Sequence, residues 1–162
     1  MIRLEQDDIA AVIDPRTGSL VSLDLVREGS VAPLLWPIAA ERGESFRVLD
    51  RSPLSARLVS EDGAVVRYEI EPGELHIESE GAGGVELRLM PAPFRSDEIA
   101  SVDAGKAVAL RWPASGVSLG VRAATGALSV SDEGLPYVSV SVEPAGGVAA
   151  VTLVIERLGS GG

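Results

Sequence analysis

The sequence predicts an all-β protein, an antiparallel β-sandwich of roughly a dozen strands. Between Ala64 and Met90, three short runs alternate apolar and polar side chains, and turn residues separate the runs. Successive side chains of a strand leave opposite faces of a sheet, so a period of two is typical of strands with one buried face. Turn residues recur about every eight to twelve positions along the chain, and no long helical period competes with them.

The predicted hairpin nearest the N-terminus joins a strand at Ile9–Asp14 to a strand at Leu20–Leu25. The segment PRTGS between them contains Gly18, and glycine adopts the positive φ that tight turns require. Two further short strands are predicted at Phe46–Leu49 and Ala56–Ser60.

The three alternating runs near the middle of the chain are predicted to be consecutive strands, because Pro72-Gly73 and the segment GAGG separate them. Their inward side chains are expected to be Val66, Tyr68, Ile70, Leu75, Ile77, Val85, Leu87 and Leu89. Their outward side chains are expected to be Arg67, Glu69, His76, Glu78, Glu86 and Arg88. The pattern therefore predicts a buried face and a polar face.

In the C-terminal half, strands are predicted at Ala107–Trp112, Val117–Ala123, Ala127–Val130, Tyr137–Glu143 and Val148–Arg157. The run Val148–Ile155 is apolar on both faces. We expect a central strand covered on both sides, either by a thick core or by a contact between protomers. Pro91–Gly105 has no clear pattern and is predicted to be a loop, whereas Ile38–Arg42 is predicted to form one short helical turn.

The length of 162 residues predicts a single domain over residues 1–158, followed by a flexible Gly/Ser tail at residues 159–162. The chain has no cysteine, which excludes disulfides and thiolate metal sites. Its net charge of -10 disfavours nucleic acid and anionic membranes as partners. The first residues, MIRLEQDD, lack the layout of a signal peptide, so we expect a cytoplasmic protein or an excised domain.

Residues that could carry chemistry are few. His76 is the only histidine, which excludes a multi-histidine metal site and any mechanism that uses two imidazoles. No G-x-x-x-x-G-K phosphate loop occurs. We therefore expect no metal, no other cofactor and no identifiable catalytic residue.

The predicted polar face carries Arg67, His76, Glu78 and Arg88. These side chains either form a solvated ladder of cross-strand charges or hydrogen-bond the hydroxyl groups of a saccharide. The aromatic residues Trp36 and Trp112 both precede proline, which favours an extended conformation near strand ends. They either pack at the rim of the core or stack on a sugar ring.

Residues 9–37, IAAVIDPRTGSLVSLDLVREGSVAPLLWP, resemble the opening of galactose-mutarotase-like (supersandwich) domains. Those domains often begin with a strand, a D-P-x-T-G-x-L hairpin, a second strand and a segment carrying "LL". The resemblance implies a β-sandwich of a family found in sugar epimerases, glycoside hydrolases and polysaccharide lyases. Mutarotases use two histidines and a carboxylate, and this chain has His76 alone, so a reduced or non-catalytic domain is implied.

The resulting hypothesis is a non-catalytic β-sandwich that binds carbohydrate or accompanies carbohydrate-acting enzymes. The first alternative is a structural module that forms homo-oligomers through its sheet edges or through Val148–Ile155. The second alternative is a small sugar isomerase or lyase that uses His76 with a neighbouring carboxylate or arginine.

Overall fold

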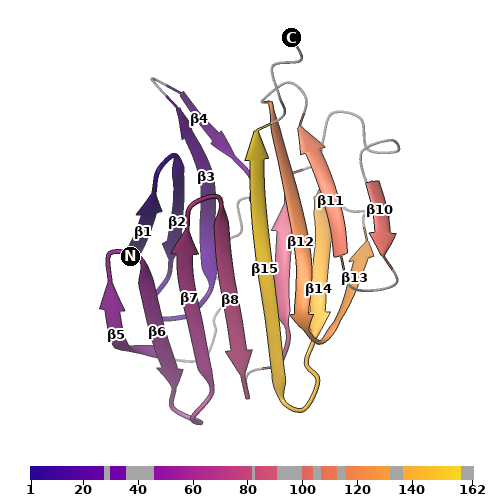
Figure 1. Cartoon of the computed structure of the whole chain (residues 1–162). Helices are drawn as coiled ribbons and strands as arrows, with labels where there is room; N and C mark the ends of the chain where they lie inside the picture. The colour runs from indigo at the N-terminus through magenta and orange to yellow at the C-terminus, as the bar shows by residue number, and fades with distance from the viewer. Residues whose placement is uncertain are drawn as a thin grey trace.

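The computed structural model describes residues 1–27, 30–35, 46–81, 83–90, 100–103, 107–112, 116–131 and 137–157. This part of the chain contains fifteen strands and no helix (Figure 1). Every strand pair is antiparallel, which confirms the predicted all-β class. Within the described segments, none forms a helix of the length and apolarity needed to cross a membrane.

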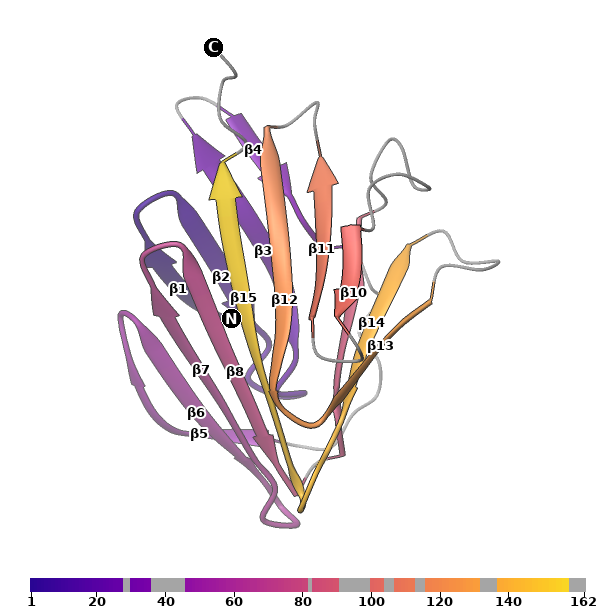
Figure 2. The same cartoon turned by 45° about the vertical axis from the view of Figure 1, so that its right-hand side comes forward.

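The strands form two layers (Figure 2). An eight-stranded sheet has the order β10 (Ala100–Asp103), β11 (Ala107–Trp112), β12 (Val117–Thr125), β15 (Val148–Arg157), β8 (Glu74–Glu80), β7 (Val65–Glu71), β6 (Ser55–Ser60) and β5 (Phe46–Ser52). A four-stranded sheet has the order β1 (Ile2–Gln6), β2 (Ile9–Ile13), β3 (Leu20–Arg27) and β4 (Ser30–Pro33). A three-stranded sheet has the order β13 (Ala127–Ser131), β14 (Val138–Glu143) and β9 (Val85–Leu89).

The four-stranded and three-stranded sheets together face the eight-stranded sheet. An antiparallel bridge between Leu35 and Leu89 joins the two smaller sheets, and the Met90 N–H donates to the Leu34 carbonyl at 2.9 Å. Buried side chains from all three sheets form one hydrophobic cluster between the layers. Among the side chains predicted to point inward, Val85 is partly buried and the other seven are buried.

The hairpin between β2 and β3 forms as predicted, and a hydrogen bond from a core residue stabilises its turn. Gly18 has a φ of 68°, and its N–H donates to the Asp14 carbonyl at 2.8 Å. The buried Tyr68 hydroxyl donates to the Gly18 carbonyl at 2.7 Å. Burial raises the pKa of the Tyr68 phenol, so the hydroxyl keeps the proton that it donates. A residue of the central meander thus anchors a turn some fifty positions earlier in the chain.

Replacing this tyrosine gives a direct test of the anchor. Tyr68→Phe keeps the ring in the core but leaves the Gly18 carbonyl without its donor, and an unsatisfied buried acceptor costs about 1–3 kcal/mol. We expect the free energy of unfolding, measured by urea denaturation, to fall by that amount. A variant with an unchanged midpoint would show that water replaces the hydroxyl and that the bond does not stabilise the hairpin.

Strand β15 lies at the centre of the large sheet, between β12 and β8, as the sequence predicted. The expectation that the chain itself covers both faces of this strand is wrong. Ala149, Val151, Leu153 and Ile155 are buried in the core, whereas Val148, Ala150, Thr152 and Val154 are half-exposed on the outer face. The outer residues are small or medium-sized, and side chains of the neighbouring strands shield them in part.

Three of the observed strands, β1, β4 and β10, were not predicted from the sequence. Strand β10 lies within the predicted loop Pro91–Gly105, so that prediction is wrong for Ala100–Asp103. The four residues of β4 and of β10 are too few to establish a period. The predicted helical turn at Ile38–Arg42 and the predicted tail lie outside the described residues.

Candidate functional site

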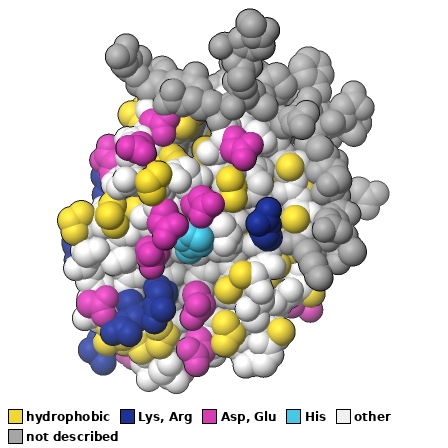
Figure 3. Space-filling model, viewed as in Figure 1, with side chains coloured by type: hydrophobic (Ala, Val, Ile, Leu, Met, Phe, Trp, Pro, Cys, Tyr) yellow, Lys and Arg dark blue, Asp and Glu magenta, His cyan; other side chains and the backbone are white. Residues whose placement is uncertain are grey.

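The candidate site lies on the outer face of the eight-stranded sheet, where β8 carries the only histidine of the chain. Pro72 and Gly73 connect β7 to β8 in a two-residue turn, and Gly73 has the positive φ of 77° that such a turn needs. This short connection fixes the register, so Glu69 lies opposite His76 and Glu71 lies opposite Glu74. Figure 3 shows the histidine on this face with acidic side chains beside it.

Strand pairing arranges the outward side chains of this face in rows. One row runs Glu69, His76, Thr152, Arg122 and Ala107 across β7, β8, β15, β12 and β11. The adjacent row towards the turn runs Glu71, Glu74, Val154, Gly120 and Ala109. The row on the other side begins Arg57, Arg67, Glu78 and Ala150. In these rows the face therefore changes from charged over β6 to β8 to mostly small and apolar over β15 to β11, where Thr152 and Arg122 are the polar exceptions.

Polar contacts fix the imidazole of His76 on both sides. Its Nδ1 atom lies 3.2 Å from the Thr152 hydroxyl on β15. Its Nε2 atom lies 3.3 Å from a Glu71 carboxylate oxygen and 3.2 Å from a Glu74 carboxylate oxygen. The His76 side chain is 37% exposed, so a ligand on this face can reach it.

An open hollow of about 250 Å³ adjoins this row over β11, β12 and β15. Small residues floor the hollow, namely Ala107, Ala109 and Gly120. The polar side chains at the hollow belong to Ser118, Arg122 and Glu156. The hollow exists because these positions of two adjacent strands, β11 and β12, carry hardly any side chain. Its volume is slightly below the range of about 300–1,000 Å³ that is usual for small-molecule pockets.

The structure brings together Arg67, His76 and Glu78, three of the predicted site residues. Arg67 and Glu78 are cross-strand neighbours, and His76 lies in the next row. All three point away from the core, as the alternation predicted.

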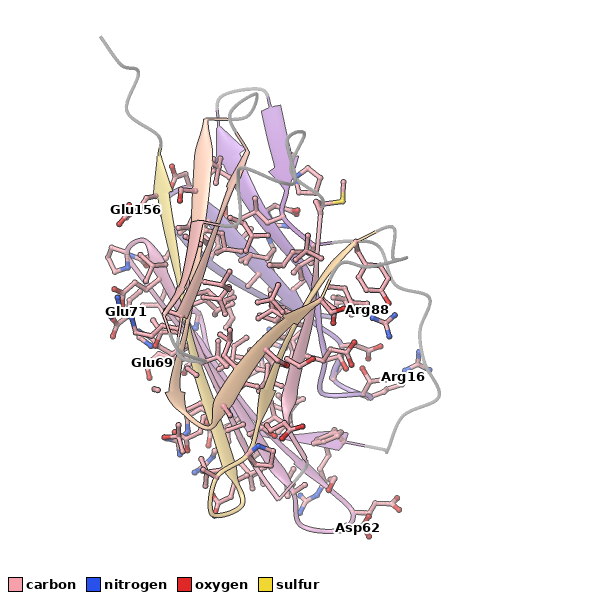
Figure 4. All side chains as sticks on the ribbon, turned by 90° about the vertical axis from the view of Figure 1, so that its right-hand side faces the viewer. Arg16, Asp62, Glu69, Glu71, Arg88 and Glu156 are labelled. Carbon is pink, nitrogen blue, oxygen red and sulfur yellow. The ribbon has the colours of Figure 1, made fainter. Side chains whose placement is uncertain are left out.

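Arg88 does not belong to this group, and the prediction that it shares a face with His76 is wrong. Strand β9 pairs with β14 in the other layer, so Arg88 lies on the far side of the molecule from Glu71 (Figure 4). Its Nε atom contacts Glu86 at 3.4 Å, and its guanidinium lies over the Tyr137 ring, 5.2 Å from the centroid. The alternation in VELRLM specified the inward and outward sides of β9 but not the sheet that β9 joins.

Of the two tryptophans predicted to border a site, Trp112 falls within the described part of the chain. Trp36 lies outside the described residues. Trp112 is the last residue of β11 and pairs with Val117, so it lies at a strand end as predicted, on a strand that borders the hollow.

Sequence reasoning missed the polar residues at the hollow and Thr152, which lies between His76 and Arg122. Arg122, Thr152 and Glu156 lie on predicted strands, yet only the strand order brings β12 and β15 next to β8. The outward position of Arg122 was visible in the alternation of VSLGVRAAT, whereas the run Val148–Ile155, which contains Thr152, is apolar on both faces and shows no such alternation. A sequence alone does not specify which strands are neighbours, so this signal could not be assigned to a site.

Comparison with known proteins gives matches in structure only. No family model matches the chain, and no curated protein matches it in sequence. A galactose mutarotase-like protein from Lactobacillus casei superposes with a TM-score of 0.61 at 12% identity, over 96% of this chain and 99% of that chain. A galactose mutarotase related enzyme from Lactobacillus acidophilus gives 0.57 at 12% identity, over 98% of each chain. The chain has a galactose mutarotase-like fold.

This likeness agrees with the resemblance seen in residues 9–37 and extends it to almost the whole chain. Within the galactose mutarotase-like fold, the D-P-x-T-G-x-L segment forms the β2–β3 hairpin, and the "LL" segment, Leu34-Leu35, links the two smaller sheets. An identity of 12% establishes the architecture and leaves the chemistry to the residues of this chain.

Proposed function

We propose that this protein binds a saccharide without turning it over, on the outer face of the eight-stranded sheet, at the hollow lined by Arg122 and along the row that joins Arg122 to His76. The observation that carries the proposal is a row of donors and acceptors next to an open hollow with an apolar floor. The fold, which this chain shares with galactose mutarotase-like proteins, is consistent with a sugar as the ligand.

The chemistry of the row suits a polyhydroxylated ring. A sugar hydroxyl both donates and accepts, and the row offers the Arg122 guanidinium and the Thr152 hydroxyl as donors beside the His76 imidazole. Adjacent strands are about 4.8 Å apart, so His76 and Arg122 lie about 10 Å from each other across β15. Glu74 supplies an acceptor next to this row and Glu156 supplies another at the hollow, whose Ala and Gly floor accepts the apolar face of a ring.

Affinity at such a site should be weak. Each hydrogen bond to a charged group contributes about 1.5–3 kcal/mol, but the site is open and water competes for every partner. We therefore expect dissociation constants in the high micromolar to millimolar range. That range suits a module that recognises abundant sugars or acts next to a catalytic partner.

A sugar isomerase is the second candidate, because His76 has two carboxylates within 3.3 Å of its Nε2 atom. A general acid or base needs such a partner to orient its imidazole. The family resemblance argues against this candidate, since mutarotases use two histidines and this chain has one. Polarimetry of freshly dissolved α-anomers separates the two candidates, because only an enzyme accelerates the approach to anomeric equilibrium.

The proposal is tested by isothermal titration calorimetry of a panel of mono- and disaccharides. For any sugar that binds, Arg122→Ala is expected to weaken binding at least about fivefold, because a charged donor is lost. Arg88→Ala is the matched control, as this arginine lies in the other layer and should leave the affinity unchanged. The melting temperature should hardly change for Arg122→Ala, since exposed polar residues contribute little to stability.

Two outcomes would contradict the proposal. Absence of a response at tens of millimolar saccharide would favour the assembly module, which light scattering would then reveal as a homo-oligomer. Turnover that disappears in His76→Ala would favour the isomerase.

A further inference from the structure

We propose that Glu71, Glu74 and His76 form a binding site for a divalent transition-metal ion of the Zn²⁺ type at the turn between β7 and β8. One imidazole nitrogen and two carboxylate oxygens converge there, with all three ligand atoms within 4.8 Å of one another. The expectation that no metal binds rested on the lack of cysteine and of a second histidine. Glu71 and Glu74 supply the ligands that a cysteine or a second histidine would otherwise provide.

The two separations that involve the imidazole nitrogen match those around one bound ion. Zinc binds imidazole nitrogen and carboxylate oxygen at about 2.0–2.2 Å, so two ligands at angles of about 90–110° lie about 2.9–3.5 Å apart. The Nε2 atom of His76 lies 3.2 Å from the Glu74 oxygen and 3.3 Å from the Glu71 oxygen. The two carboxylate oxygens lie within 4.8 Å of each other, so rotation of the glutamate side chains would bring both to one ion at the imidazole.

The second nitrogen of His76 has the contact expected of a metal ligand. Ligating histidines almost always use their other ring nitrogen to hydrogen-bond a neighbouring group, which fixes the ring orientation. Here Nδ1 lies 3.2 Å from the Thr152 hydroxyl, which β15 holds from outside the group of ligands. Thr152 therefore acts as a positioning residue that directs Nε2 towards the two carboxylates.

The β7–β8 turn also places like charges side by side. Glu71 and Glu74 are direct cross-strand neighbours, an arrangement that is unfavourable without a compensating cation. Each carboxylate is paired with His76, and a single imidazole carries at most one positive charge. A divalent ion offsets both carboxylates at once while it binds the neutral imidazole.

The imidazole selects the kind of metal. Calcium and magnesium prefer sites made of oxygen ligands, whereas imidazole favours zinc, copper, nickel and iron. Three protein ligands leave at least one position of the ion open to water or to another oxygen ligand. We commit to Zn²⁺ as the probe, because it has no redox chemistry that could complicate a titration.

The single histidine makes the test specific. Its Cε1–H and Cδ2–H signals are the only imidazole signals of the untagged protein, and they can be followed by NMR during a Zn²⁺ titration. We expect both signals to shift or broaden and to saturate at one equivalent of metal, with a micromolar dissociation constant. Signals that do not respond to millimolar Zn²⁺ would overturn the proposal.

Substitutions separate this site from unspecific binding to an acidic surface. Glu71→Gln and Glu74→Gln should each weaken binding at least about tenfold, and Thr152→Val should weaken it about tenfold through the lost orientation. Glu78→Gln, which removes an exposed carboxylate from the same strand and the same face, is the matched control and should have no effect. If all four variants bind Zn²⁺ equally well, the ion is only attracted by the surface charge and the site is wrong.

This inference does not depend on saccharide binding. The Zn²⁺ titration uses the protein alone, and the saccharide titration can be repeated after treatment with a chelator. If the Zn²⁺ titration gives a negative result, the saccharide proposal is unaffected, and the reverse also holds.

Discussion

Leu153→Asp is expected to prevent folding. Leu153 lies on the central strand of the large sheet, has no solvent exposure, and is flanked by Val121 and Leu75, which are equally buried. An aspartate there would place a charge without a partner between the two layers, or would have to be protonated to avoid it. Either state costs several kcal/mol, which is a large part of the total stability of a domain of this size.

Val154→Asp is the matched control for this variant. The same substitution one residue later falls on the half-exposed outer face, next to Gly120 and Glu74. We expect this variant to fold and to lose no more than about 1 kcal/mol, from repulsion by Glu74. Circular dichroism and thermal melts compare the two. Equal stability of both variants would contradict the assignment of the two faces of β15.

Gly126→Ala is expected to have the second largest effect. The chain leaves the large sheet after β12 and enters the second layer as β13, and Gly126 is the residue between them. Its φ is +110°, and a Cβ there would overlap the Glu143 carbonyl oxygen and lie 2.9 Å from a Val142 methyl group. The backbone of β14 would have to move, so we expect a loss of about 3 kcal/mol or more in urea denaturation.

Gly63→Ala separates the steric overlap from the cost of the backbone conformation. Gly63 also has a positive φ, +88°, but a Cβ there would contact nothing within 4 Å. Its substitution should cost only about 1–2 kcal/mol for the left-handed conformation. If the two alanine variants lost the same stability, the close approach of β14 to the crossing point would be refuted.

The fold was largely predictable because its signals are local. The alternation of the β7, β8 and β9 runs specified which side chains point inward, and Gly18 marked the hairpin that Tyr68 anchors. Strand β1 was missed although Ile2 and Leu4 alternate with charged residues. Strand β10 was missed because a four-residue edge strand is too short to show a period.

The candidate site was only partly predictable, because it depends on which strands are neighbours. His76, Arg67 and Glu78 share one hairpin, so local alternation was enough to group them. Arg88 has the same alternation, but β9 crosses to the other layer after the glycines that follow β8. Arg122 and Thr152 reach His76 through pairings between strands far apart in sequence, β8 with β15 and β15 with β12, which no pattern within one strand encodes.

The same limit applies to the metal ligands. Glu71 and Glu74 flank Pro72-Gly73, and a two-residue hairpin places its flanking residues opposite each other, so their proximity was contained in the sequence. The orientation of the His76 ring could not be predicted from the sequence, because Thr152 on β15 helps to determine it. A histidine on a polar strand face acquires a defined geometry only from its neighbours in the folded sheet.

The central claim is that the outer face of the eight-stranded sheet binds a saccharide at the row that joins His76 to Arg122. Backbone amide NMR of the isotope-labelled protein, titrated with the best-binding sugar, tests it most directly. The account predicts that chemical shift changes concentrate on β8, β15, β12 and β11, around His76, Thr152 and Gly120. Changes confined to β9, β13 and β14, or no change at tens of millimolar sugar, would contradict it.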